Sequence, residues 1–269
     1  MKISNLIEIT PKDLIIFDLD RTVVPSKAPM DPQMSALMTR LLAVKRVAII
    51  GGGKYGLFKT LFLKQLKTPK SLLKNLFLFP TTATSFYIYK SGWKNVYALY
   101  LSKIEKNKIR KAFYNIFRKI GYKHPQKTYG MVIEDRGTQI TFSALGQDVV
   151  AILGKKRGVA LKTKWLQENR DIKMTIVKLL AKLLPELEVR AAGLTSIDVT
   201  KKGIDKAYGL KQIKKHLHLG IKDMLFIGDA IFPGGNDYAV VKTGVDYVPV
   251  TGPAQTKDVI RAILKLTKK

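Results

Sequence analysis

Apolar residues in the first third of the chain fall into short runs that alternate with amphipathic stretches. The apolar runs at residues 14–17 and 47–50 predict buried strands. Asp31 and Pro32 predict a helix start, because an aspartate N-cap satisfies free amides and proline fits the first turn. The apolar face of this helix comprises Met34, Leu37, Met38, Leu41 and Leu42. A second helix is expected over residues 54–66, so this region predicts an α/β core.

The alternation changes near residue 84. Residues 86–89 and 95–99 flank a Ser-Gly turn and predict a hairpin, and Ser102 with Glu105 predicts a capping box opening a helix. Strands are expected near residues 129–134 and 138–145, followed by a helix that ends before Pro185. From Lys201 the α/β pattern returns, with helices over residues 205–217 and near the end of the chain. We therefore expect a core domain of residues 1–86 and 191–269 and an inserted α+β domain of residues 87–190.

Acidic side chains follow two of the predicted strands. Asp18 and Asp20 come directly after the first strand, and Asp229 follows the apolar run at residues 224–227. Parallel strands bring their carboxyl ends to one edge of a sheet, where ligands bind. Carboxylates this close repel, so a cation or a shared proton is expected between them. An acidic turn without function remains the alternative. Oxygen ligands suit Mg²⁺, and the candidate ligands are Asp18, Asp20, Asp229, Asn236 and Asp237.

A glycine-rich turn, Gly51, Gly52 and Gly53, separates a predicted strand from a predicted helix. Its free amides would hold phosphate oxygens. A tight βα turn with no ligand explains the same residues equally well. Lys206, by itself, would be an exposed lysine in a lysine-rich chain.

Taken together and in this order, these motifs resemble the haloacid dehalogenase (HAD) superfamily, specifically its phosphomannomutase-related branch of capped sugar-phosphate enzymes. The resemblance covers nearly the whole chain and includes the stretches 18–22, 50–54, 203–206 and 228–237. It implies a Rossmann-like α/β core with a mainly parallel sheet and an inserted α+β cap domain.

The resemblance also implies a role for each of these residues. Asp18 would be the nucleophile that forms an aspartyl-phosphate, and Asp20 would be the general acid and base. Lys206 would screen the carboxylate and phosphoryl charges. Mg²⁺ would be held by Asp18, by the backbone carbonyl of Asp20 and by Asp229, with Asn236 and Asp237 as a ligand or as support behind the ligands. The phosphate would lie against the amides of Gly51, Gly52 and Gly53.

In the inserted domain, residues 136–143 alternate, placing Gln139, Thr141 and Ser143 on one face of a strand. By pattern alone this face meets either sugar hydroxyls or solvent. The resemblance implies that three side chains bind the substrate. They are the arginine at the position of Arg136, and a serine and an aspartate in a strand at residues 195–198. The expected substrate-binding set is Arg136, Ser143, Gln147, Ser196 and Asp198.

Two positions depart from the family pattern. Gln147 stands where phosphomannomutases carry an arginine for the distal phosphate of a bisphosphorylated sugar, and a neutral amide cannot replace that cation. Arg21 replaces the usual glycine after the second aspartate, which would either add an anion contact or block the site. These departures favour a Mg²⁺-dependent phosphatase acting on a sugar phosphate or a similar metabolite. A phosphosugar mutase is the alternative.

Composition adds limits on compartment and partners. The chain is 46% hydrophobic, contains no cysteine, and has no apolar run long enough to cross a bilayer. We therefore expect a soluble, cytoplasmic enzyme without a membrane partner, and its oligomeric state stays open. Its net charge of +28 is spread along the sequence, and it predicts loose, non-specific nucleic-acid binding. A lysine bias of the whole proteome, or adaptation to high potassium or heat, explains the same charge without a nucleic-acid partner. A catalytically silent basic binding protein on the same fold is the alternative from another functional class.

Overall fold

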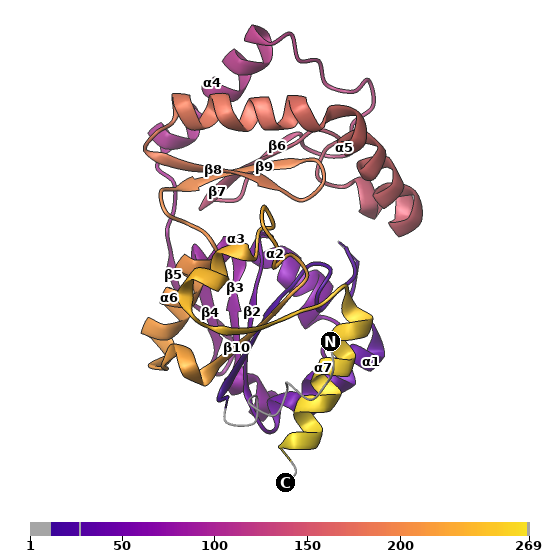
Figure 1. The fold of residues 1–269 in the computed structure, drawn as a ribbon, viewed down its shortest axis with the longest axis vertical. Coiled ribbons are helices and arrows are strands. Elements are labelled where there is room, and N and C mark those ends of the chain that lie inside the picture. The colour runs from indigo at the N-terminus through magenta and orange to yellow at the C-terminus, as the bar shows by residue number, and fades with distance from the viewer. Residues whose placement is uncertain (1–11, 27, 268–269) are drawn as a thin grey trace. The chain divides into compact units, whose positions relative to one another are not determined.

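A computed structural model of the chain describes residues 12–26 and 28–267, and it divides into two compact units (Figure 1). The first, here called the core unit, comprises Met1–Ala98 and Asp205–Lys269. The second, here called the inserted unit, comprises Leu99–Ile204. The α/β fold class expected from the sequence is confirmed, with helices on both faces of a mostly parallel sheet in the core unit.

The core unit contains one sheet of seven strands in the order β11-β10-β1-β2-β3-β4-β5. The first five strands in this order run parallel, and β4 and β5 form an antiparallel hairpin at the edge. The strands are β1 (Leu14–Asp18), β2 (Arg46–Ile50), β3 (Leu76–Phe79), β4 (Ser85–Tyr89), β5 (Trp93–Ala98), β10 (Met224–Gly228) and β11 (Asp246–Pro249).

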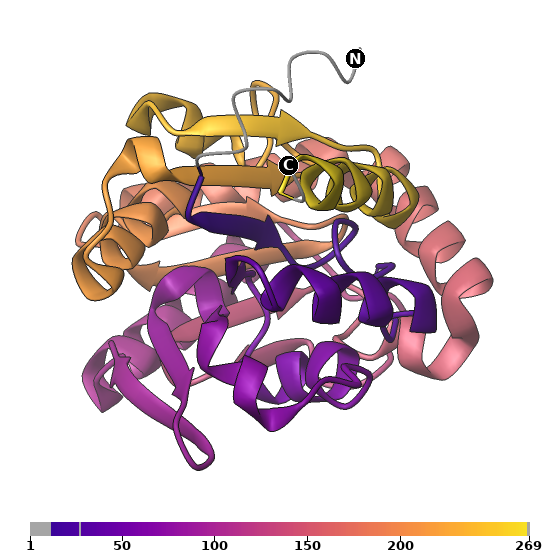
Figure 2. The ribbon, with the colours of Figure 1, turned by 90° about the horizontal axis from the view of Figure 1, so that it is seen from below.

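Helices cover both faces of this sheet (Figure 2). Ile15 and Phe17 of β1 pack in the cluster that contains α1 (Pro32–Leu42) and α7 (Pro253–Leu266). Leu14 and Ile16 pack on the other face, in the cluster of α6 (Lys206–Leu217) and the 3-10 helix η5 (Tyr238–Thr243). Because both faces are buried, β1 is apolar at every position before its terminal aspartate.

The helix starts follow the local signals in the sequence. Asp31 caps α1 by accepting a hydrogen bond from the Met34 amide at 2.9 Å, with Pro32 in the first turn. The helix expected over residues 54–66 is shorter, consisting of α2 (Tyr55–Phe58) and the π-helical turn η2 (Lys59–Leu63). The remaining short elements of the core unit are η3 (Lys70–Asn75), α3 (Pro80–Ala83) and η4 (Ile221–Asp223).

The inserted unit is a four-stranded antiparallel sheet in the order β6-β7-β9-β8, with two helices over its apolar face (Figure 1). The strands are β6 (Ile133–Asp135), β7 (Gln139–Ser143), β8 (Leu187–Ala192) and β9 (Ser196–Lys201). The helix α4 (Lys103–Lys119) begins at the predicted capping box of Ser102 and Glu105. The helix α5 (Val149–Leu183) leaves helical geometry at Gly154 and Asn169. Phe142 of β7 packs in the cluster that α4 and α5 share.

The boundaries between the units lie later in the chain than residues 87 and 190, where the sequence placed them. Backbone pairing explains both shifts. The hairpin β4–β5 continues the core sheet through β3, so residues up to 98 belong to the core unit. Strand β9 pairs with every residue of β7, so the inserted unit extends through β9 and ends at residue 204. Hydrophobic patterning does not reveal which sheet a hairpin extends.

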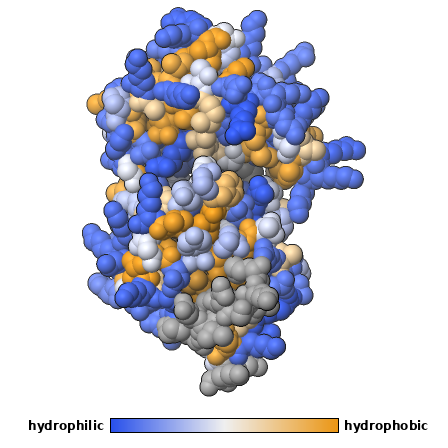
Figure 3. All heavy atoms as spheres, in the orientation of Figure 1, coloured by the Kyte–Doolittle hydropathy of each residue, from blue (hydrophilic) through white to orange (hydrophobic). Residues whose placement is uncertain are grey.

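Within residues 12–26 and 28–267, every helix is too short or too polar to serve as a membrane span. Hydrophilic side chains project from both units over the face seen in Figure 3, with smaller apolar patches between them.

Candidate active site

The acids predicted from the sequence meet at the carboxyl edge of the core sheet. Asp18 is the last residue of β1, and Asp229 follows β10. These two strands are parallel neighbours with Phe17 opposite Ile227, so the next residues emerge side by side. Strand β1 continues into α1 and β2 on one side, whereas β10 belongs to the later half of the chain. This is the switch point of an open sheet, where ligands bind in such folds.

A third carboxylate, Asp237, folds back against the end of β10. It is fully buried and accepts a hydrogen bond from the Ala230 amide at 3.2 Å. Gly228 permits this approach, because a Cβ at that position would lie 2.5 Å from Asp237 Oδ2. Oxygens of Asp18, Asp229 and Asp237 all lie within 4.8 Å of one another.

Lys206 supplies the cation at the centre of this group. It is the first residue of α6, whose N-cap Asp205 accepts a hydrogen bond from the Tyr208 amide at 2.7 Å. Gly209 lets the helix approach the sheet, since a Cβ there would lie 2.4 Å from Ile50 Cδ1. As a result, Lys206 Nζ lies 2.5 Å from Asp18 Oδ1 and 2.8 Å from Asp237 Oδ1. The side chain is 2% exposed, so this lysine is not the exposed residue that composition alone would suggest.

Burial dominates the electrostatics of the site. Removal from water raises the pKa of Asp18 well above its usual range; Lys206 opposes this shift, and Asp237 and Asp229 add to it. For Lys206, burial alone would lower the pKa, but the carboxylates of Asp18 and Asp237 outweigh it and raise the pKa. Burial raises the pKa of Asp229 to about 6, against the effect of the nearby Arg21 guanidinium. Three carboxylates facing two cations, Lys206 and Arg21, leave the group with excess negative charge.

These residues fit a divalent cation. The donors are carboxylate oxygens only, which is the set that Mg²⁺ prefers over softer metals. Their mutual distances allow one ion to contact more than one of them. Asp229 does not pair with Lys206; its carboxylate pairs with Arg21, whose Nε lies 3.3 Å from Asp229 Oδ2.

The other two predicted ligands lie at the margin of this group. Asp20 forms an isolated bridge with Val24, is partly exposed, and its charge raises the pKa of Asp229. Asn236 is exposed in the turn before Asp237. Asp18, Lys206, Asp229 and Asp237 are therefore the residues that the fold brings together most tightly.

The glycine-rich turn lies at the same edge, directly after β2, and its backbone is held from behind. The amides of Thr81 and Thr82 donate to the carbonyls of Gly53 and Gly51, both at 2.9 Å. Thr81, Thr82 and Ala83 all have left-handed backbones, with φ of 48°, 55° and 62°. Such conformations are costly for residues with a side chain and collect at functional sites. This left-handed turn was not predicted, because non-glycine residues give no signal of positive φ in a sequence.

On the inserted unit, the expected substrate-binding residues gather on the polar face of the sheet. Arg136 Nε lies 2.8 Å from Glu134 Oε2, and its Nη2 donates to Gln147 Oε1 at 3.0 Å. Glu134 is buried beside it and was not predicted, although its place two residues before Arg136 in β6 puts both on one face. Arg136 is therefore already paired with an acid within its own unit.

Hydroxyl and amide groups continue this network. Thr141 Oγ1 donates to Asp198 Oδ1 at 2.7 Å and accepts from Gln139 Nε2 at 2.8 Å. Ser143 Oγ lies 3.2 Å from Thr195 Oγ1 and 3.3 Å from Ser196 Oγ. Gln139, Thr141 and Ser143 are at most 1% exposed.

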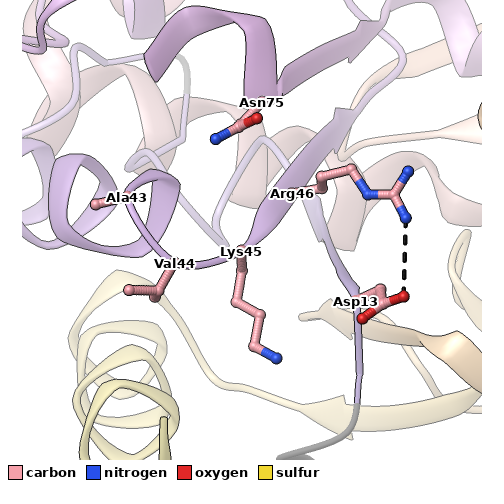
Figure 4. A pocket seen from close by; sticks show the side chains of 6 residues that line it. All are labelled: Asp13, Ala43, Val44, Lys45, Arg46 and Asn75. Carbon is pink, nitrogen blue, oxygen red and sulfur yellow. Dashed lines mark ion pairs between the residues drawn. The ribbon is translucent and has the colours of Figure 1, made fainter. Parts of the chain in front are cut away.

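A hollow of about 330 Å³ lies elsewhere on the core unit (Figure 4). It is lined by Asp13, Ala43, Val44, Lys45, Arg46 and Asn75. Asp13 precedes β1 and Arg46 begins β2, so the hollow is at the amino edge of the sheet, opposite the acids. Arg46 and Asp13 form an ion pair of 3.8 Å across it.

Two short clusters of basic residues are exposed, one in each unit. Lys155, Lys156 and Arg157 lie near the start of α5, and Lys214 and Lys215 lie in the last turn of α6. The three residues of α5 are the first basic side chains after Gln147, which stands where the family pattern has an arginine. Their exposure agrees with solvated side chains rather than with members of the buried network around Arg136.

Comparisons with known proteins relate the chain to one family. Residues 34–266 match the family model described as eukaryotic phosphomannomutase. Phosphomannomutase from Schizosaccharomyces pombe is 24% identical over 232 residues, covering 86% of this chain and 85% of the relative. Phosphomannomutase from Encephalitozoon cuniculi is 27% identical over 241 residues, covering 85% and 84%. The family match begins after Asp18 and Asp20, so for these two residues the geometry described above is an independent observation.

Solved structures share the fold at low identity. The IMP-bound, N-terminally truncated IMP-nucleotidase of Plasmodium falciparum superposes with a TM-score of 0.68 at 16% identity, covering 94% of this chain and 68% of that one. The trehalose-6-phosphate phosphatase of Aspergillus fumigatus has a TM-score of 0.58 at 16% identity, with coverage of 100% and 98%. At this identity the likeness concerns the fold alone. Both neighbours are members of the HAD superfamily, as the sequence motifs predicted.

Proposed function

We propose that this chain, which belongs to the eukaryotic phosphomannomutase family of HAD-type phosphoryl-transfer enzymes, is a Mg²⁺-dependent phosphatase of a sugar phosphate or a similar metabolite. The observation that carries this proposal is the buried group of Asp18, Asp237 and Lys206 beside Asp229. A buried carboxylate paired with an ammonium at the ligand-binding edge of an open sheet is a costly arrangement. Phosphoryl transfer to Asp18 would explain why the protein keeps this buried, charged arrangement.

Asp18 would act as the nucleophile. One of its carboxylate oxygens bonds to phosphorus while the bond from phosphorus to the leaving oxygen breaks, which gives an aspartyl-phosphate. Asp20 gives a proton to that leaving oxygen, and then takes a proton from the water that attacks the aspartyl-phosphate. Phosphate leaves, and both aspartates return to their starting states. Asp20 therefore loses one proton in the first step and regains one in the second.

Positive charge and backbone amides would hold the phosphoryl group. Lys206 stays protonated because its pKa is raised, so its ammonium keeps Asp18 oriented and screens its charge. The amides of the turn at Gly51, Gly52 and Gly53 would donate to phosphate oxygens, and the left-handed turn behind them fixes their direction. Mg²⁺, held by Asp18, Asp229 and the Asp20 carbonyl, with Asp237 and Asn236 in support, would neutralise the incoming phosphoryl charge.

The remainder of the substrate would be bound by the polar face of the inserted unit, through Arg136, Ser143, Gln147, Ser196 and Asp198. Hydrogen bonds on this face join hydroxyl, amide and carboxylate groups, and the charge of Arg136 is compensated by Glu134. Such a surface suits the hydroxyls of a sugar better than a second phosphate dianion. This chemistry favours a monophosphate substrate and net hydrolysis.

A phosphosugar mutase is the second candidate, and the family match over residues 34–266 favours it. A mutase returns the phosphoryl group from Asp18 to a second hydroxyl of the sugar instead of to water. It must therefore bind a bisphosphorylated intermediate at both ends. Gln147 provides an amide rather than a cation for that purpose, which is why hydrolysis is the first proposal.

The proposal is tested by measuring phosphate release and phosphate migration in parallel. The panel contains mannose 1-phosphate, glucose 6-phosphate, trehalose 6-phosphate and IMP, with and without Mg²⁺. A second set includes a trace of glucose 1,6-bisphosphate, and the Asp18→Asn protein is the blank. The expected result is Mg²⁺-dependent phosphate release that Asp18→Asn lowers by at least about a thousandfold.

Other outcomes separate the alternatives. Isomerisation without net phosphate release would establish the mutase. Release that Asp18→Asn leaves unchanged would exclude the aspartyl-phosphate mechanism. No turnover of any compound by the folded wild-type protein would favour the basic, catalytically silent binding protein.

A further inference from the structure

Arg21 forms an ion pair with Asp229 at the acidic edge of the core sheet. Within residues 12–26 and 28–267, it is the one arginine that does so. It follows Asp20 directly, and its backbone is left-handed, with φ of 66°. The turn is fixed at both ends, because the Arg21 amide donates to the Val24 carbonyl at 2.8 Å and Asp20 forms a bridge with Val24. A side chain in this conformation costs stability relative to glycine.

The Arg21 side chain reaches one of the three acids at this edge. Arg21 Nε lies 3.3 Å from Asp229 Oδ2. Lys206 pairs with Asp18 and Asp237, and Arg21 is the cation that pairs with the third carboxylate. The Arg21 side chain is 58% exposed and the Asp229 side chain is 12% exposed. The guanidinium therefore lies at the solvent side of the cluster and covers an acid that is largely buried.

We propose that Arg21 is a resident counter-cation of Asp229 that competes with a divalent cation for this carboxylate and so weakens Mg²⁺ binding. A carboxylate that already accepts a guanidinium must release it, or share its charge, before it binds a metal. A fixed unit positive charge a few ångströms from a divalent ion also repels it. Both effects have the same sign. This inference rests on the proposed function, since it takes the acidic edge as the metal site.

The arrangement also gives the protein a way to balance the acids before a metal arrives. Asp18, Asp229 and Asp237 bring three carboxylates within 4.8 Å, and Lys206 and Arg21 bring two cations. Metal binding then exchanges one cation for another at Asp229 rather than adding charge to an uncompensated acid. Arg21 is a positioning residue in this sense, because it acts on the metal through Asp229.

Three substitutions separate the charge from the backbone. Arg21→Ala removes the guanidinium and keeps a side chain at positive φ. Arg21→Gly removes both the charge and the backbone strain. Arg21→Lys keeps a positive charge at the same place. Arg46→Ala is the matched control, because Arg46 also pairs with one aspartate, Asp13, but at the opposite edge of the core sheet.

The measurement is isothermal titration of the metal-free proteins with MgCl₂, which needs no substrate and no turnover. We expect Arg21→Ala and Arg21→Gly to bind Mg²⁺ about tenfold more tightly than wild type, from the loss of one repelling charge. Arg21→Lys and Arg46→Ala should keep affinities near that of wild type. Thermal melting without metal should show Arg21→Gly above Arg21→Ala, because only glycine relieves the left-handed backbone.

Affinities of Arg21→Ala and Arg21→Gly equal to wild type, or weaker, would overturn this inference and leave the phosphatase proposal standing. Equal tightening in Arg21→Lys would also overturn it, because the charge would not be the cause. A failure of wild type and all variants to bind Mg²⁺ would overturn both this inference and the metal site of the proposed function.

Discussion

The two units of this protein bury polar groups in opposite ways. At the acidic edge of the core unit, full charges are buried: the side chains of Asp18, Asp237 and Lys206 are at most 6% exposed. On the sheet face of the inserted unit, the buried groups are mostly neutral hydroxyls and amides, with one ion pair between Arg136 and Glu134. The buried polar groups of the core unit at this edge are therefore mainly ions, and those on the sheet face of the inserted unit are mainly neutral hydrogen-bonding groups.

Under the proposed function, the two units would contribute differently to the reaction. Buried ions are stable only when paired in good geometry, so removing one partner is expensive. Buried cations of this kind, together with backbone amides, suit the stabilisation of a phosphoryl dianion. Neutral donors and acceptors cost less to bury and discriminate between hydroxyl patterns, which suits selection among sugars. Perturbing one unit should therefore affect chemistry and stability, and perturbing the other should affect substrate selection.

Lys206→Met is expected to have the largest effect. It leaves Asp18 and Asp237 buried without their cation, and the free energy of unfolding should fall by about 3–5 kcal/mol. Urea denaturation at pH 7 measures it. Lys211→Met, at an exposed position of the same helix, should change this free energy by no more than about 0.5 kcal/mol. Equal effects of the two substitutions would show that the buried charges are not strongly coupled.

Arg136→Ala should act on substrate selection. We expect a fall of about tenfold in kcat/KM for the true sugar phosphate, about 1.4 kcal/mol of transition-state binding, because the substrate loses a contact. Turnover of para-nitrophenyl phosphate, which lacks a sugar, should stay near the wild-type rate. Arg110→Ala is the control, since Arg110 pairs with Asp135 on the more exposed side of the same strand. A matching loss on both substrates would contradict the division between the units.

Lys173 provides a test by pH. Its Nζ contacts the carbonyls of Ala192, Gly193 and Leu194, at 3.3, 2.8 and 3.4 Å, and burial lowers its pKa to about 8. An unfolded lysine titrates near 10.4, so between about pH 8 and 10 the unfolded state binds more protons. Wild type and Lys173→Met should be compared by their free energies of unfolding. The difference, wild type minus variant, should rise over this pH interval by about 1 kcal/mol per pH unit at most. A flat difference would mean that Lys173 is better solvated than its position indicates.

Ser102→Ala should have the smallest effect and marks the baseline for the inserted unit. The Ser102 hydroxyl accepts from the Glu105 amide at 3.1 Å, and the Glu105 carboxylate accepts from the Ser102 amide at 2.6 Å. Loss of this cap should lower the free energy of unfolding by about 0.5–1 kcal/mol, with no change in KM. A rise in KM would mean that substrate binding depends on the stability of the whole unit rather than on its polar face.

Local patterns predicted much of this molecule. The caps of α1 and α4 and the start of α6 follow from side chains within three residues of the helix ends. The position of Asp18 beside Asp229 follows from a general rule, that parallel strands end at one edge. The same rule placed the glycine turn after β2 at that edge. In each case the feature depends on residues close together in the sequence, or on a rule that holds for the whole fold class.

What the sequence by itself determined is therefore the kind of fold, the acidic edge and the chemistry of its side chains. Only the tertiary structure decided which charges meet. Lys206 pairs with Asp18 across 188 residues because Gly209 lets α6 approach the sheet, and Arg21 reaches Asp229 because its backbone turns left-handed. It also decided that the hairpin β4–β5 belongs to the core sheet. These outcomes depend on close approach and backbone geometry between distant segments, and a one-dimensional pattern of polar and apolar residues does not contain them.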